Sequence, residues 1–136
     1  MAFLVGLTIA VVVGALGRLS GMERQRAYYT TVTIVVAHYY ALFAVIGAST
    51  QTLVIEALAG LVFAGAAVLG FRSSFWLVAF ALAGHGVYDL FHGFIIANPG
   101  VPAFWPAFCL SFDLAAGVYL AWLLKSGRMP ANHPAP

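Results

Sequence analysis

Six ionisable side chains lie inside stretches of the sequence that are otherwise apolar enough to cross a membrane. The chain has only four acidic residues and four histidines, and three of each kind fall in these stretches: His38, Glu56, His85, Asp89, His92 and Asp113. An ionised side chain at the centre of a bilayer costs about 2.5–3.5 kcal/mol on insertion scales. Such groups normally face a bundle interior or a water-filled cavity, so a functional site is the default hypothesis for them.

The densest part of this set is the segment 85–92, which reads His-Gly-Val-Tyr-Asp-Leu-Phe-His. His85, Asp89 and His92 are spaced i, i+4 and i+7, so they share one face of a helix. Two imidazoles and one carboxylate then point toward a common region. The alternative is a hydrogen-bonded polar seam that joins helices. Three groups on one face, with three more on other segments, favour a site over a seam.

Imidazole and carboxylate ligands suit zinc, and also non-haem iron or manganese. We therefore predict a divalent metal ion, zinc or iron, with His85, Asp89 and His92 as the ligand core and His38 as a further ligand. Glu56 and Asp113 are the expected catalytic carboxylates, unless they complete the ligand set. Zinc would activate water, with one of these carboxylates as general base, whereas iron would activate oxygen.

These residues predict a metal-dependent hydrolysis, hydration or oxidation of a small lipophilic substrate. Proton and metal transporters use the same residue types, but the polar groups are concentrated in one half of the helices, which disfavours a full pathway in a monomer. Haem ligation by His38 and His85 would leave the carboxylates unexplained. A non-enzymatic accessory subunit of a membrane complex is a further alternative. Tyr88 is a possible hydrogen-bond donor to the site, and Cys109 is more typical of a small buried hydrophobe than of a ligand.

Five apolar segments must position these groups, and we expect helices at 2–16, 27–48, 52–71, 74–97 and 104–124. A spanning helix needs about 20 apolar residues, which the last four segments satisfy and the first barely approaches. The chain is 63% hydrophobic and 7% charged, whereas a soluble domain has about 25% charged residues. We predict an all-α integral membrane bundle of five transmembrane helices over residues 1–127, followed by a disordered tail at 128–136.

The depth of the polar groups is also informative. At about 1.5 Å rise per residue, all six lie roughly 6–18 Å below the same end of their helices. The first segment contributes none of them, so we expect it to stand outside the site.

The basic residues predict the orientation of the bundle. All of them fall in the first and third loops or after the fifth segment: Arg18, Arg24, Arg26, Arg72, Lys125 and Arg128. The positive-inside rule then places the N-terminus outside and the C-terminus in the cytoplasm. No Lys or Arg precedes the first apolar segment, so we interpret it as a permanent helix and not as a secretory signal.

The same composition limits the partners. The net charge is +2 and no basic patch suggests nucleic acid. A single cysteine excludes an internal disulfide. The expected partners are membrane lipids, a small lipophilic substrate, and a second copy of the chain or another subunit of a membrane complex.

Three segments together resemble an uncharacterised family, a domain of unknown function, of small polytopic bacterial membrane proteins. They are the segment 85–92, the loop 98–106 (Asn-Pro-Gly-Val-Pro-Ala-Phe-Trp-Pro) and the segment 108–113 (Phe-Cys-Leu-Ser-Phe-Asp). Glu56 matches an acid on the preceding helix of that family, and Tyr88 stands where the family has Trp. The match covers mainly residues 50–125. It implies that the polar groups are a family signature and that the chain crosses the bacterial inner membrane several times, but it implies no activity.

Overall fold

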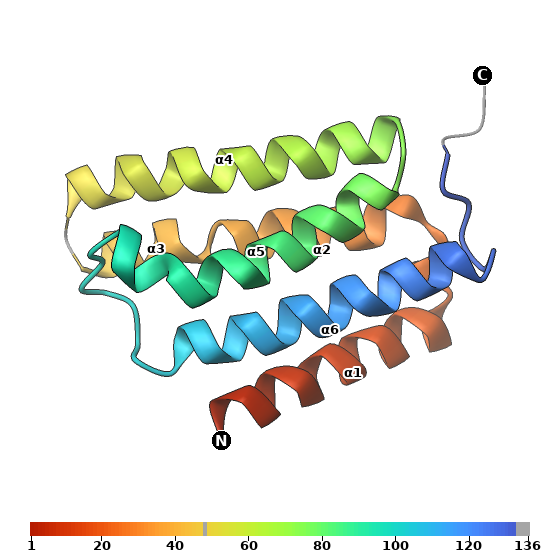
Figure 1. The fold of residues 1–136 in the computed structure, drawn as a ribbon, viewed down its shortest axis with the longest axis horizontal. Helices are drawn as coiled ribbons and strands as arrows, with labels where there is room; N and C mark the ends of the chain where they lie inside the picture. The colour runs from red at the N-terminus through yellow and green to blue at the C-terminus, as the bar shows by residue number, and fades with distance from the viewer. Residues whose placement is uncertain (48, 133–136) are drawn as a thin grey trace.

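The computed structural model describes residues 1–47 and 49–132, which form a bundle of helices lying side by side (Figure 1). In chain order the elements are α1 (Ala2–Ser20), the 3₁₀ turn η1 (Met22–Arg24), α2 (Arg26–Ala37), α3 (Tyr39–Ile46), α4 (Thr50–Arg72), α5 (Trp76–Ile95) and α6 (Trp105–Lys125). Because α2 and α3 together form one span, five spans are long and apolar enough to cross a membrane. The structure thus confirms an all-α bundle with five candidate membrane spans.

The first helix is longer than its apolar run predicts. It continues through Arg18 to Ser20 and ends where Gly21 adopts a left-handed φ of 77° and donates its N–H to the Arg18 carbonyl. Glycine takes this conformation without the steric cost of a Cβ, so it is a common helix terminator. α1 packs on α6 at one edge of the bundle (Figure 1), away from α4 and α5.

The central helix is α5, which packs against α6 on one side and against α4 and α2 on the other. Its contact with α6 is close because Gly86 and Gly117 lie at the crossing. A Cβ on Gly86 would be 3.1 Å from the Asp113 Cβ, and one on Gly117 would be 3.0 Å from the Ala83 Cβ. Small residues allow helix backbones to approach in this way. The close approach places the polar face of α5 directly beside Asp113.

A break at His38 divides the second span into α2 and α3, where the sequence predicts one continuous helix. The His38 N–H bonds to the carbonyl of Val35, three residues back, and its ring Nδ1 lies 2.7 Å from the Ile34 carbonyl. α4 crosses at this level, since a Cβ on Gly60 would be 2.6 Å from the Ala37 carbonyl. A tight turn inside a helix often marks a functional region, and here it comes directly before Tyr40.

Residues 128–132 are expected in a disordered tail, but the structure packs them against the bundle. Met129 is buried, and the Phe75 N–H donates to the Ala131 carbonyl at 2.6 Å. Arg26, itself buried, donates to the carbonyls of Ala131 and Pro130 and to those at the end of α4. Arg26, about a hundred positions earlier in the chain, therefore holds this segment against the bundle. Residues 133–136, including His133, lie outside the described residues.

Candidate metal centre between α5 and α6

The polar face of α5 points into the bundle, as its spacing predicts. His85, Asp89 and His92 are each at most 2% exposed, and so are Glu56 on α4 and Asp113 on α6. His38 is only half-buried. Five of the six ionisable groups are thus removed from the surface of the bundle, and each must find its partners inside it.

His85, Asp89 and Asp113 form one compact group. The His85 Nδ1 lies 2.7 Å from Asp113 Oδ2 and 3.5 Å from Asp89 Oδ2. His85 and Asp89 are one helical turn apart on α5, and Asp113 reaches them from α6 beside Gly86. One donor atom from each of the three side chains lies within 4.8 Å of the other two. Three donor atoms at this spacing could hold a single metal ion.

The carboxylates of this group have unused hydrogen-bonding capacity. Both oxygens of Asp89 and the Oδ1 of Asp113 are buried and have no hydrogen-bond partner. A buried ionised carboxylate is costly unless it is paired or coordinates a metal. One imidazole and two carboxylates are ligands that zinc, iron and manganese accept, and three protein ligands leave a coordination position open for chemistry. The residues present therefore fit a divalent metal ion.

A second polar pair lies closer to the end of the bundle. The His92 Nε2 is 2.8 Å from Glu56 Oε1, and the Asn98 side chain donates to the same oxygen at 2.8 Å. Asn98 also donates to the Tyr40 carbonyl at 3.0 Å, which ties the loop after α5 to α3. His92 and Asn98 line a cavity of about 260 Å³ beneath the α5–α6 loop. His92 thus contacts both Glu56 and this cavity.

Two tyrosines lie between the polar groups. The Tyr40 ring stacks on His92 with centroids 3.7 Å apart, and it lies 6.3 Å from the His85 ring. Tyr88 lies 5.5 Å from His92 and 5.9 Å from His85. Both hydroxyls are buried without a hydrogen-bond partner. The Tyr88 hydroxyl is therefore available to a ligand or a water molecule in the site, whereas the Tyr40 hydroxyl also lies near the Asp89 carboxylate.

The structure arranges the predicted residues differently from the sequence-based assignment. The donor group includes Asp113, which is predicted as a catalytic carboxylate. It does not include His92, which pairs with Glu56, or His38, whose ring bonds to a carbonyl of its own helix. His85 and Asp89 are in the group, as predicted.

Two residues near the site are not predicted from the sequence. Asn98 lies in a turn-forming Asn-Pro-Gly sequence, where an asparagine is expected for backbone reasons alone. Its place in the loop directly after α5, at the same end of the bundle as Glu56, is the signal that would identify it. Tyr40 is interpreted as a packing or interfacial residue, because aromatic side chains are common at membrane boundaries. In the structure, Tyr40 follows the break at His38, and its ring stacks on His92.

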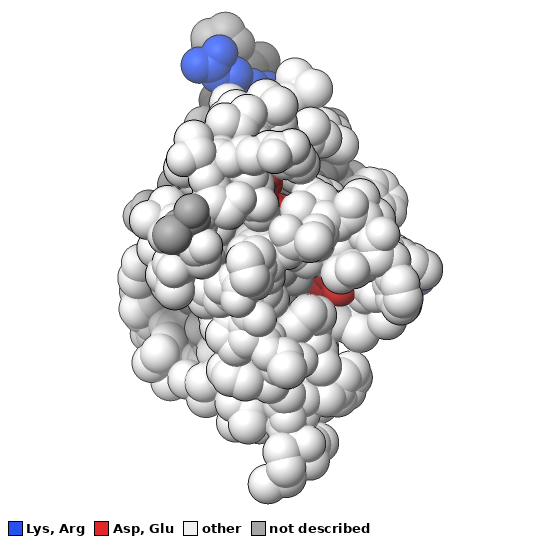
Figure 2. Space-filling view, turned by 90° about the vertical axis from the view of Figure 1, so that its left-hand side faces the viewer, with Lys and Arg blue, Asp and Glu red and all other residues white. Residues whose placement is uncertain are grey.

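Figure 2 shows the end of the bundle where α4 begins and α5 ends, and this end is almost free of charged side chains. Small areas of Asp or Glu atoms are visible there between atoms of residues that are neither acidic nor Lys or Arg. The resemblance to a family of small membrane proteins stays a prediction. No family model, no curated protein and no solved structure matches this chain.

Proposed function

We propose that this membrane protein is a metal-dependent enzyme whose metal ion is held by His85, Asp89 and Asp113. One observation supports the proposal. Three buried side chains bring donor atoms close together, and their two carboxylates have three oxygens without a hydrogen-bond partner. The single imidazole of His85 can offset at most one of the two negative charges of these carboxylates in the apolar bundle. A divalent cation balances these charges and uses the free lone pairs, which a hydrogen-bonded seam does not do.

A divalent cation at this position supplies a Lewis acid that activates water for hydrolysis or hydration, or, in the case of iron, a centre for oxidation. The chain supplies proton transfer through Glu56 and His92. Their 2.8 Å contact is a geometry in which the imidazole can hold a proton and the carboxylate can accept it. Because His92 also lines the cavity under the α5–α6 loop, protons can exchange with that cavity. The hydroxyls of Tyr40 and Tyr88 are placed to orient a polar group of the substrate.

The proposed substrate is a small lipophilic molecule. A groove of about 320 Å³, lined mainly by apolar side chains, lies between α1, α2 and α6. Cys109 lines this groove and is nearly fully buried, and it is one helical turn before Asp113 on α6. A molecule dissolved in the membrane could therefore approach the site from the side. The apolar lining excludes substrates that need many hydrogen bonds.

A proton relay is the second candidate. It is favoured by the two histidine–carboxylate pairs, at 2.7 Å and 2.8 Å, with the Tyr40 ring between them. Chains of Asp, Glu and His side chains conduct protons in membrane pumps. This function requires no metal ion, so metal content separates the two candidates.

The decisive experiment is to measure metal content by mass spectrometry on protein purified in detergent. We expect about one zinc, iron or manganese ion per chain in the wild type, as for a catalytic site with three protein ligands. His85→Ala and Asp89→Asn should lose the ion, because each removes one of three ligands. His38→Ala is the matched control and should retain it.

His92→Ala tests the composition of the ligand set. The geometry predicts that this variant keeps its metal ion, whereas a ligand role for His92 predicts its loss. Circular dichroism and gel filtration of every variant would establish that the fold is intact. A well-folded wild type without any metal ion would refute the enzyme proposal and leave the proton relay.

A further inference from the structure

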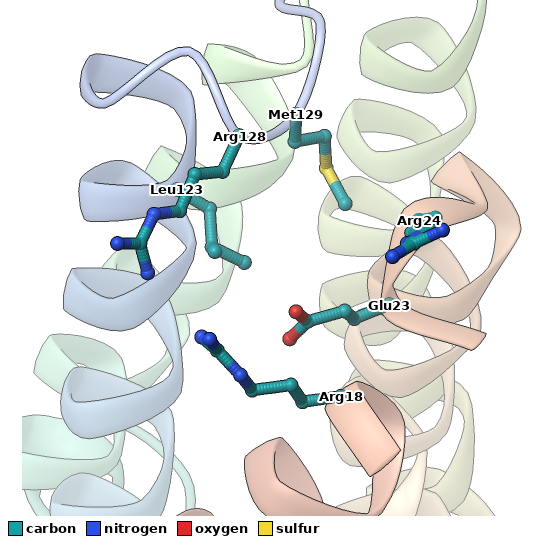
Figure 3. A pocket seen from close by; sticks show the side chains of 6 residues that line it. All are labelled: Arg18, Glu23, Arg24, Leu123, Arg128 and Met129. Atoms are coloured by element: carbon teal, nitrogen blue, oxygen red, sulfur yellow. The ribbon is translucent and has the colours of Figure 1, made fainter. Parts of the chain in front are cut away.

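A second cavity, of about 440 Å³, lies at the opposite end of the bundle from the α5–α6 loop, where α1 and α6 end. Figure 3 shows its lining, which comes from α1, η1, the end of α6 and the segment that follows: Arg18, Glu23, Arg24, Leu123, Arg128 and Met129. The proposed metal centre lies toward the other end, so this cavity requires a separate explanation.

The charge of the cavity is strongly unbalanced. Three guanidinium groups and one carboxylate leave a net charge of +2 in its lining. The carboxylate of Glu23 accepts a hydrogen bond from the Tyr119 hydroxyl at 3.0 Å. Over residues 1–47 and 49–132, none of the arginines or lysines forms an ion pair with an acidic side chain. Within residues 1–47 and 49–132, no carboxylate therefore pairs with the arginines of this cavity, so they can bind an anion.

The three arginines of the cavity are exposed, and one of them, Arg128, is held in place by an aromatic ring. The Arg128 guanidinium lies over the Trp122 ring, 4.3 Å from its centroid, and Trp122 stacks on Tyr119 at 5.6 Å. Figure 3 shows Arg18 and Glu23 extending in the same direction, toward the end of α6, where Arg128 lies. Planar guanidinium groups bind phosphate oxygens in bidentate fashion, which a diffuse positive surface does not achieve.

An apolar groove adjoins this charged cavity. It has a volume of about 340 Å³ and is lined by α1 and α6 residues, including Gly14, Ala15 and Tyr119. Tyr119 therefore lines the groove with its ring and reaches the cavity with its hydroxyl. Exposed apolar side chains such as Leu16 and Leu19 surround the same end of α1. An amphiphile could therefore bind with its charged group in the cavity and its apolar part in the groove.

We propose that this cavity binds the phosphate of an anionic glycerophospholipid, with an acyl chain in the groove between α1 and α6. The six basic side chains all lie at this end of the bundle, at the end of α1, the start of α2, the end of α4 and the end of α6. Basic cavities between membrane helices are suited to anionic headgroups. The bound lipid fixes α1, the most peripheral helix, against α6.

The test is a titration of the full-length protein in neutral detergent with phosphatidylglycerol or phosphatidylcholine, followed by native mass spectrometry. The double variant Arg18→Gln, Arg128→Gln removes two charges from the cavity. The matched control Arg72→Gln, Lys125→Gln removes two charges from the same end of the bundle but outside the cavity. We expect the first variant to bind phosphatidylglycerol at least about tenfold more weakly. The control should match the wild type, and phosphatidylcholine should bind weakly to all three.

Three results would overturn the proposal. Unchanged binding in the cavity variant would exclude these arginines as headgroup ligands. Equal weakening in both double variants would assign the effect to general surface charge. Displacement of the lipid by excess inorganic phosphate, with phosphate retained by the wild type alone, would identify a site for the free anion instead of a lipid.

Discussion

At the residue scale, the two histidines of α5 are distinguished by their partners and not by their spacing. His85 faces Asp113 and Asp89, which together have three oxygens without hydrogen-bond partners. His92 faces Glu56, one oxygen of which already accepts hydrogen bonds from both His92 and Asn98. The first environment has three unpaired carboxylate oxygens around one imidazole, whereas in the second only the Oε2 of Glu56 is unpaired. The geometry therefore favours a cation beside His85 and proton exchange at His92.

The hydrogen bonds that Glu56 accepts predict different stabilities for two substitutions of this residue. Glu56→Ala leaves the His92 and Asn98 donors unpaired in a buried site, which costs about 1–3 kcal/mol for each unsatisfied group. Glu56→Gln keeps an acceptor oxygen in the same place, so its stability should stay close to that of the wild type. Thermal unfolding in detergent would measure the difference between the two variants.

Neither Glu56 variant should change the metal content, since Glu56 is outside the group of three donors. Metal analysis of Glu56→Gln is the sharper of the two measurements because its fold should be intact. Loss of the ion from that variant would show that Glu56 is itself a ligand, and the assignment of the site would have to change.

At the element scale, the site depends on how closely α5 and α6 approach. Gly86 lies one residue after His85, and a Cβ there would be 3.1 Å from the Asp113 Cβ and 3.2 Å from the Leu110 carbonyl. The glycine therefore sets the distance between the His85 ring and the Asp113 carboxylate. Gly84, two residues earlier on the same helix, has open space around its Cβ position. The two glycines form a natural pair for comparison.

Gly86→Ala should push α5 and α6 apart by a few tenths of an ångström and weaken metal binding. Overpacking of this kind typically costs about 1–3 kcal/mol. Gly84→Ala adds a methyl group in open space and should leave stability unchanged or raise it by up to about 1 kcal/mol, because alanine favours helix. Competition with a chelator would measure metal retention in both variants. Equal retention would show that the helix separation does not control the site.

At the scale of the whole molecule, the sequence predicts the architecture better than the site. Five long apolar segments with polar connections leave few alternatives, because every backbone polar group must be satisfied inside a membrane and helices achieve this locally. The inward direction of His85, Asp89 and His92 also follows from helical periodicity. These predictions depend on residues that are near one another in the sequence.

The features that the sequence does not predict depend on contacts between distant segments. Asp113 joins His85 only because α6 crosses α5 at Gly86, and its depth alone does not reveal this contact. The segment after α6 is polar and proline-rich, so composition suggests disorder, yet the buried Arg26 holds it through backbone carbonyls. The break at His38 differs from these features, because its hydrogen bonds are to carbonyls of its own helix and no proline or glycine marks it in the sequence.

The orientation of the bundle in the membrane is predicted from charge and can be tested directly. All six basic residues lie at the end where α1, α4 and α6 finish, so the positive-inside rule places that end in the cytoplasm. Ala103, in the α5–α6 loop, and Ser126, directly after α6, are both exposed and lie at opposite ends. In a Cys109→Ser background, Ala103→Cys should react with a membrane-impermeant maleimide in spheroplasts, and Ser126→Cys should react only after permeabilisation. The reverse pattern would place the arginine cavity outside and the His92 cavity in the cytoplasm, so that protons for the site would come from the opposite side of the membrane.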